Sequence, residues 1–207
     1  MARLIDISPL LNPKVAVWPG DVAFQRSVAL DMKTGDNLTL SSITTTVHVG
    51  AHTDAPNHYA VDGVSMSERA LDPYYGPCQV IRVSTAKGER ILPEHLDDPV
   101  SAPRVLFVTE SFPDPNDFNE DFCSLSPELV DMLGDAGVIL VGIDTPSVDL
   151  FSDRDLLSHN AIARRDMAIL EGVVLADVPS GTYTLIALPL KIEGADASPV
   201  RAVLVAD

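Results

Sequence analysis

Apolar residues in this chain alternate with polar ones, or form short continuous runs, more often than they recur at helical spacing. Such runs are typical of strands with one or both faces buried. Gly, Pro, Asn and Asp separate many of them, as expected for turns. The pattern predicts strands over residues 3–8, 24–30, 38–47, 77–84, 105–108, 138–143, 173–175, 182–190 and 200–206, with 24–30 and 38–47 forming a hairpin.

Helical signals are fewer and lie mostly late in the chain. Ser126-Pro127-Glu128 supplies a capping serine, a proline in the first helical position and an acid in the first turn, which predicts a helix ending near Gly134. A second helix is predicted over 155–165. The spacing of Ser65–Glu68 is that of a capping box and predicts a short helix, whereas residues 111–125 have the composition of an exposed loop. Together these elements indicate a sheet-rich α/β or α+β fold.

One stretch, His48-Val49-Gly50-Ala51-His52-Thr53-Asp54-Ala55-Pro56-Asn57-His58, holds three of the five histidines. Histidine and carboxylate are the usual ligands of zinc and related divalent metals. The four titratable residues share one parity and would share a face of an extended chain. The two ends would then lie roughly 33 Å apart, so a common site needs a bend. The density of these residues indicates a metal or catalytic site rather than separately packed histidines.

A helical reading of this stretch, with His48 and His52 four residues apart as in H-E-x-x-H, fits poorly. The preceding run, 38–47, is rich in β-branched residues, and Gly50 and Pro56 break helices. We therefore predict a strand end followed by a loop, with Gly50 and Pro56 as the places where the chain bends.

His159 and Glu171 are further candidates. In one unbroken helix they would lie about 18 Å apart, so a shared site requires the helix to end between them. The spacing alone does not decide whether Glu171 is a metal ligand. If both residues converge with the histidine stretch, the ligand count fits two metal ions bridged by the carboxylates of Asp54 and Glu171. His58 would then remain as a group suited to moving a proton.

Trp18, the only tryptophan, precedes the turn-forming pair Pro19-Gly20. It is either a packing residue or a flat wall for an aromatic ligand. Motifs of other catalytic classes are absent: the chain contains no G-x-S-x-G, no Walker loop and no G-x-G-x-x-G.

Composition limits the class of protein. The 207 residues, 46% of them hydrophobic, suffice for one domain over 1–207 with a sizeable core. A net charge of −16 argues against partners such as nucleic acid or an anionic membrane. The longest apolar runs, such as 138–141, are far too short to span a membrane, and no signal peptide is recognisable. Cys78 and Cys123 lack metal-site spacing. We therefore expect a cytoplasmic protein with reduced cysteines.

The histidine stretch resembles the H-x-G-T-H-x-D-x-P-x-H signature of the cyclase family of metal-dependent hydrolases. Further segments resemble the bacterial kynurenine formamidases within that family, and the resemblance covers almost the full chain. These segments are Trp18-Pro-Gly-Asp, Asp144-Thr-Pro-Ser-Val-Asp149, Ala168-Ile-Leu-Glu-Gly172, Ile186-Ala-Leu-Pro-Leu-Lys191 and Asp196-Ala-Ser-Pro-Val-Arg201. One departure is Ala51, where the signature has Thr. Because Thr is not a ligand there, we expect this change to affect hydrogen bonding around the site rather than metal binding.

The resemblance implies a swivelling β/β/α fold, a homodimer and a binuclear zinc enzyme. The reaction implied is that of an arylformamidase, which hydrolyses N-formyl-L-kynurenine to L-kynurenine and formate in tryptophan breakdown. It assigns one zinc to His48, His52 and Asp54, the second zinc to Asp54 and His159, a further bridging carboxylate to Glu171, proton transfer to His58 and a substrate contact to Trp18.

Two alternatives stay open. The first is a sister hydrolase that opens a cyclic amide such as isatin and prefers manganese. The second is a non-catalytic protein that binds a metal or ligand on the same scaffold.

Overall fold

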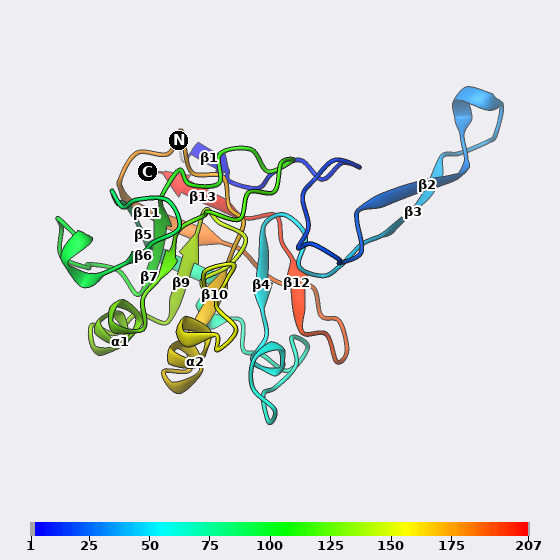
Figure 1. The fold of residues 1–207 in the computed structure, drawn as a ribbon. Helices are drawn as coiled ribbons and strands as arrows, with labels where there is room; N and C mark the ends of the chain where they lie inside the picture. Colours follow the sequence, from blue (N-terminus) through cyan, green and yellow to red (C-terminus); the bar gives the residue numbers. More distant parts are fainter. Residues whose placement is uncertain (1–2, 207) are drawn as a thin grey trace.

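The computed structural model describes residues 3–206, whose centre is a mixed seven-stranded sheet (Figure 1). Four neighbouring strands run parallel and form the most buried part of the sheet. The strands at the other edge run antiparallel to their neighbours. In sheet order the strands are β1 (Arg3–Asp6), β13 (Val203–Ala206), β11 (Gly181–Ile186), β5 (Tyr75–Arg82), β7 (Arg104–Val108), β9 (Leu140–Ile143) and β10 (Ala168–Leu170).

The parallel strands are buried on both faces, which explains their continuous apolar sequences. Every residue of β7, β9 and β10 is buried. Side chains alternate between the two faces of a strand. Leu106 and Val108 accordingly belong to one apolar cluster, and Val105 and Phe107 belong to another. The sheet therefore separates two cores.

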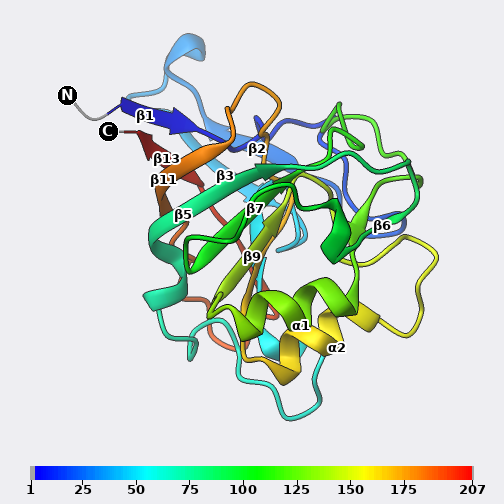
Figure 2. The ribbon, with the colours of Figure 1, turned by 90° about the vertical axis from the view of Figure 1, so that its left-hand side faces the viewer.

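Two α-helices lie within residues 3–206, and both cover the sheet face that carries Phe107 (Figure 2). They are α1 (Pro127–Asp135) and α2 (Leu157–Arg164). Ser126 caps α1 as predicted, since its Oγ accepts the Leu129 N–H at 3.1 Å. None of the helices in this described part is long and apolar enough to cross a membrane. The expected class, a sheet-rich α/β fold with few helices, is confirmed.

Short elements complete the fold. The opposite sheet edge, beyond β10, is joined by a two-stranded pair, and another two-stranded pair lies near the start of α1. These pairs are β4 (His52–Asp54) with β12 (Ala197–Pro199), and β6 (Arg90–Ile91) with β8 (Ser124–Leu125). The single-turn 3-10 helices are η1 (Met32–Thr34), η2 (Pro56–His58), η3 (Asp72–Tyr74) and η4 (Pro93–His95).

The predicted hairpin is confirmed, and it stands away from the rest of the molecule (Figure 1). β2 (Gln25–Leu30) pairs antiparallel with β3 (Leu40–Thr44), and η1 lies at its tip. Every residue of both strands is exposed. We call residues 25–44 the arm.

Three predicted features are wrong. Glu68 accepts from the Ser65 N–H at 3.0 Å, as in a capping box, but the chain makes only a turn there. Residues 173–175 form no strand: Val173 and Leu175 fill the core from an irregular segment, whereas Val174 is exposed. The expected exposed loop is confirmed over most of 111–125, but its end is wrong, since Phe122 is fully buried and β8 closes the segment. In the last two cases composition misled because tertiary burial decided the outcome.

Candidate metal centre

Glycines let the histidine stretch approach the end of β10. Gly50 and Gly172 have φ angles of +60° and +65°, a region that favours glycine. A Cβ on Gly172 would lie 2.3 Å from the Gly50 carbonyl oxygen, so no other residue fits without movement. His52 and Glu171 therefore exchange backbone hydrogen bonds of 3.1 and 2.9 Å. This close approach places β4 beside the carboxylate of Glu171.

The bend expected at Pro56 is present and brings His58 back toward His48. η2 begins at Pro56, and the His58 N–H donates to the Ala55 carbonyl at 2.9 Å. The rings of His48 and His58 lie 4.3 Å apart between centroids. The two ends of the stretch therefore share one site, as the signature requires.

The chain also turns back between His159 and Glu171. α2 ends at Arg164, and Asp166 then adopts φ +50°, a left-handed conformation that reverses the direction of the chain. β10 follows at once and carries Glu171 at its end. The histidine stretch, His159 on α2 and Glu171 next to β10 thus converge on one buried cluster.

Asp54 lies at the centre of this cluster, and its carboxylate faces three imidazoles. His48, His52, Asp54, His159 and Glu171, the five predicted ligands, come together. The closest atom pairs are His48 Nδ1 and Asp54 Oδ1 at 3.1 Å, His52 Nε2 and Glu171 Oε2 at 3.1 Å, His52 Nε2 and Asp54 Oδ1 at 3.5 Å, His159 Nε2 and Asp54 Oδ2 at 3.5 Å, and His159 Nε2 and Glu171 Oε1 at 3.9 Å.

These atoms are close but do not hydrogen-bond. Both oxygens of Asp54, Nε2 of His52 and Nε2 of His159 are buried and have no hydrogen-bond partner among residues 3–206. Buried polar atoms without partners are costly. Nitrogen and oxygen ligands of a tetrahedral zinc lie roughly 3.3–3.5 Å from one another, close to the spacings found here. The donor set therefore fits divalent metal ions.

Two overlapping groups could each hold an ion. His48, Asp54 and His58 form one, and His52, Asp54 and Glu171 form the other, with the donor atoms of each group within 4.8 Å of one another. Asp54 belongs to both, as the prediction of a bridging carboxylate requires. The grouping differs from the predicted ligand sets in three respects: His58 joins His48 and Asp54, His52 is grouped with Glu171 and not with His48, and His159 belongs to neither group.

Each imidazole has its second nitrogen held by an oxygen, as is usual for histidines that bind metals. His48 Nε2 lies 3.0 Å from Asp196 Oδ2, His52 Nδ1 lies 2.9 Å from the Gly50 carbonyl, and His159 Nδ1 lies 2.8 Å from Asp149 Oδ2. These contacts point the remaining nitrogen of each ring into the cluster. The rings are therefore oriented before any ion binds.

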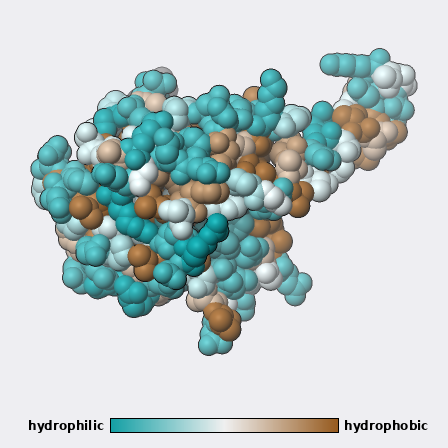
Figure 3. Space-filling model, in the orientation of Figure 1, coloured by the Kyte–Doolittle hydropathy of each residue, from teal (hydrophilic) through white to brown (hydrophobic). Residues whose placement is uncertain are grey.

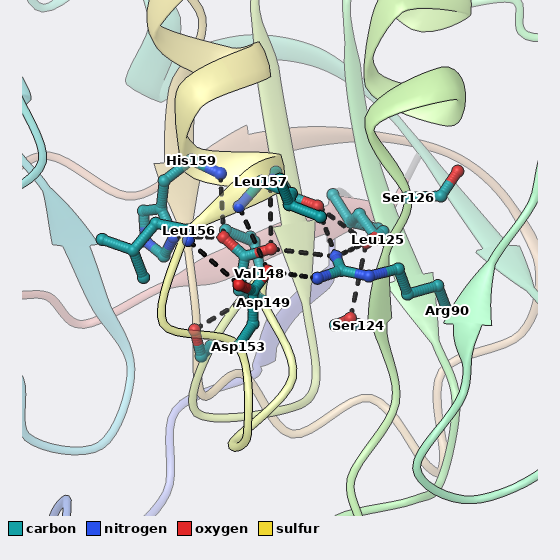
Figure 4. A network of polar contacts seen from close by, with 12 residues as sticks. Arg90, Ser124, Leu125, Ser126, Val148, Asp149, Asp153, Leu156, Leu157 and His159 are labelled. Atoms are coloured by element: carbon teal, nitrogen blue, oxygen red, sulfur yellow. Dashed lines mark hydrogen bonds and ion pairs between the residues drawn. The ribbon is translucent and has the colours of Figure 1, made fainter.

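Asp149 and Asp196 were not predicted as site residues. Asp149 also accepts the backbone N–H groups of Ser158 and His159, at 2.8 and 3.0 Å, and pairs with Arg90 at 2.9 Å (Figure 4). The sequence signal for Asp149 was weak, because a capping residue directly precedes its helix whereas α2 begins only at Leu157, with Leu156 before it. Asp196 gave no such signal, since it reaches His48 from 148 residues away.

Neighbouring charges in the cluster shift the pKa values of its histidines and of Asp54 in the metal-free chain. Burial lowers the pKa of His48, but the carboxylates of Asp54 and Asp196 raise it more, to about 9. Burial also lowers the pKa of His159, and Asp149 and Asp54 raise it to about 10. Burial raises the pKa of Asp54, yet the neighbouring imidazoles hold it well below its usual value. Cations are thus strongly favoured at this position.

The cluster opens into a cavity of about 850 Å³. Trp18, Phe112 and Phe118 line it, and the Trp18 ring lies 5.6 Å from Phe118 and 5.1 Å from Phe151 between centroids. Trp18 therefore both packs in an aromatic cluster and forms part of the cavity wall. The cavity therefore combines the cluster of candidate metal ligands with an aromatic wall.

Comparisons with known proteins agree with this geometry. The Cyclase family matches residues 5–150. A potential metal-dependent hydrolase with cyclase activity is 26% identical, with a TM-score of 0.84 over 100% of this chain and 99% of that one. A predicted metal-dependent hydrolase from Bacillus stearothermophilus is 27% identical, with a TM-score of 0.82 over 99% and 98% of the two chains.

Isatin hydrolase A from Labrenzia aggregata shares the fold, with 22% identity and a TM-score of 0.82 over 99% of this chain and 94% of that one. The family match covers most of the chain, including the histidine stretch and Asp149. On this evidence the chain belongs to the Cyclase family and has the fold of its metal-dependent hydrolases.

Proposed function

We propose that this protein is a zinc-dependent arylformamidase that hydrolyses N-formyl-L-kynurenine to L-kynurenine and formate. The observation that carries the proposal is the buried carboxylate of Asp54, which has no hydrogen-bond partner in the described chain and is shared between two groups of metal ligands. The aromatic cavity above it supports an aryl amide as substrate.

The proposed enzyme holds two zinc ions in each subunit. His48, His52 and Asp54 would hold one ion, Asp54 and His159 would hold the other, and Glu171 would supply a further carboxylate shared by both. When bound, zinc lowers the pKa of water to about 7 and polarises a carbonyl group. Asp149, Asp196 and the Gly50 carbonyl keep the three imidazoles turned toward the ions.

His58 would carry the proton. Its side chain is 35% exposed to the cavity side of the cluster, and its ring lies 4.3 Å from that of His48. The amine released from an anilide is a poor leaving group as an anion, so it needs a proton as the bond breaks. Asp196 Oδ2 lies 3.5 Å from His58 Nδ1 and would orient the ring for this transfer.

Trp18 would bind the aryl ring of the substrate. It lines the cavity together with Phe112 and Phe118, whose flat apolar faces suit an aniline ring. These rings also keep water away from the amide except at the cluster.

The test is an assay with paired substrates and metals. The metal-free chain is reconstituted with zinc or with manganese and supplied with N-formyl-L-kynurenine or with isatin. We expect hydrolysis of N-formyl-L-kynurenine that a chelator abolishes, and two metal ions per chain. Faster opening of isatin would favour the second candidate, which the structural likeness to isatin hydrolases supports. Failure on both substrates with either metal would favour a non-catalytic metal-binding protein.

The proposed setting is the cytoplasm, and the proposed assembly is a homodimer. Cys78 and Cys123 are both buried and unbridged, as suits a reducing compartment. The arm supports the dimer, because it presents apolar side chains to solvent (Figure 3). An isolated two-stranded hairpin is only marginally stable in water, so a partner surface for the arm is needed.

A further inference from the structure

Outside the metal cluster, the charged side chains of the cavity wall are acidic, with one exception. Asp54 and Glu171 lie in the metal cluster, and Asp21 and Glu110 are exposed elsewhere along the wall. Arg154 is the one arginine or lysine that lines the cavity in residues 3–206. A substrate carboxylate is repelled by the exposed acids outside the metal cluster and attracted by this guanidinium.

Arg154 has no partner of its own. It forms no ion pair and no side-chain hydrogen bond within the described chain, although Asp153 and Asp155 flank it. Asp153 is already engaged: it pairs with Arg90, and its Oδ1 accepts the N–H groups of Asp155 and Leu156 at 2.8 and 3.1 Å (Figure 4). The N–H donors of the Arg154 guanidinium are therefore available to bind a ligand.

The backbone beside Arg154 is fixed by the same network that orients the metal cluster. Arg90 binds both Asp149, which holds His159, and Asp153, which caps the turn (Figure 4). Leu156 is held at φ +52°, an unfavourable conformation for a residue with a side chain. Arg154 is thus attached to a rigid turn at a set place on the cavity wall.

We infer that Arg154 binds the carboxylate of an α-amino-acid group on the substrate. The inference rests on the proposed function, and it makes the enzyme selective for aryl amides with an amino-acid side chain over neutral ones. A guanidinium pairs with a carboxylate through two parallel hydrogen bonds. Asp21, an exposed acid on the same wall, complements the ammonium of such a group.

The test compares two ligands that differ only in this group. L-kynurenine and 2-aminoacetophenone share the aromatic ketone, and only the first carries the amino acid. Binding is followed by the fluorescence of Trp18, the only tryptophan. In Arg154→Gln we expect the Kd of L-kynurenine to rise about tenfold, the loss typical of one hydrogen-bonded charged partner. The Kd of 2-aminoacetophenone should not change.

Two further variants separate charge from structure. Arg154→Lys should recover part of the affinity for L-kynurenine. Arg164→Gln removes an arginine on α2 that lies outside the cavity, 3.7 Å from Asp131. This variant should leave the Kd of both ligands unchanged.

If Arg154→Gln raised the Kd of both ligands equally, the residue would have a structural role and the inference would be overturned. An unchanged Kd for L-kynurenine, or a wild-type protein that binds the two ligands equally, would overturn it as well. The proposed function fails separately, if the wild-type enzyme leaves N-formyl-L-kynurenine intact, because the binding comparison needs no turnover.

Discussion

Asp54 is the residue on which both candidate ion sites depend. Its two oxygens face His48, His52 and His159. The carboxylate is buried, so water cannot take its place if it is removed. We expect Asp54→Ala to lose both metal ions, because two cations close together need an anion between them. Metal analysis after dialysis measures this loss. Asp62→Ala, which removes an exposed acid in a turn, is the matched control. A full metal complement in Asp54→Ala would refute the bridging role.

His58 differs from the other histidines of the cluster because it is half-exposed. We expect His58→Ala to retain its metal and to lose between about 10² and 10⁴ in kcat, the range typical of a missing general acid or base. Metal content and kcat are measured on the same sample, with His95→Ala as a control at a histidine outside the cavity. Loss of one metal ion instead would make His58 a ligand, as its place beside His48 and Asp54 allows.

Metal binding should depend steeply on pH. The pKa values of His48 and His159 in the metal-free chain are raised to about 9 and about 10, so both rings hold a proton near neutral pH. A metal binds only the neutral ring, and each bound ion therefore displaces protons. Because His48 and His159 would hold different ions, the affinity for each zinc should fall by about tenfold for each pH unit that the solution is acidified below 9, and loading of both ions should fall by about 100-fold.

Competition with a chromophoric chelator at about pH 7 and about pH 8 measures this dependence, and a pH indicator in weak buffer counts the protons released. An affinity that is independent of pH would show that these imidazoles are already neutral in the metal-free protein.

At the scale of elements, the site depends on how closely β4 approaches the end of β10. In Gly172→Ala the new Cβ would meet the Gly50 carbonyl oxygen at 2.3 Å, and φ is +65°. We expect a loss of about 2–4 kcal/mol in the free energy of unfolding, from strain and displacement of β4. Weaker metal binding should accompany this loss, because His52 and Asp54 move with the strand.

Gly137→Ala is the matched control for this prediction. Its φ of +84° imposes similar backbone strain, but no atom lies within 4 Å of the new Cβ. It should cost about 1 kcal/mol and leave metal binding intact. Equal losses in the two variants, measured by chemical denaturation, would mean that the close approach of Gly50 does not matter.

The parts of this site that were predictable from sequence are those set by local spacing. The shared parity of His52 and Asp54 and the turn at Pro56 follow from backbone geometry, and the structure bears them out. His48 lies in a bend before the strand, so parity did not place it. Asp196 escaped prediction because β12 brings it to His48 through strand pairing of distant segments. The missed strand β10 is three residues long, and its pairing with β9 rather than its own composition defines it.

At the scale of the whole molecule, charge and exposure single out the arm. The chain carries a net charge of −16, so two copies repel unless they meet through a neutral surface. The arm is neutral, since Arg26 and Lys33 balance Asp31 and Asp36. It also exposes six large apolar side chains: Val28, Leu30, Met32, Leu38, Leu40 and Ile43.

Apolar side chains occupy both faces of the arm. Val28 and Ile43 share one face by the strand register, and Leu30 and Leu40 are paired beyond the bulge. A symmetric dimer uses such a surface twice, once from each copy. The arm is thus suited to be enclosed by a second copy rather than to lie flat on its own subunit.

Two charges on one face of the arm should therefore break the dimer. Val28→Asp with Ile43→Asp places a pair of carboxylates where apolar contact is expected, and each buried unpaired charge costs several kcal/mol. We expect light scattering to give twice the chain mass of 22.2 kDa for the wild type and the single mass for the double variant. Leu4→Asp with Leu71→Asp adds the same charge at exposed apolar positions outside the arm and should leave the dimer intact. A wild-type monomer, or a double variant that stays dimeric, would show that the arm has another role.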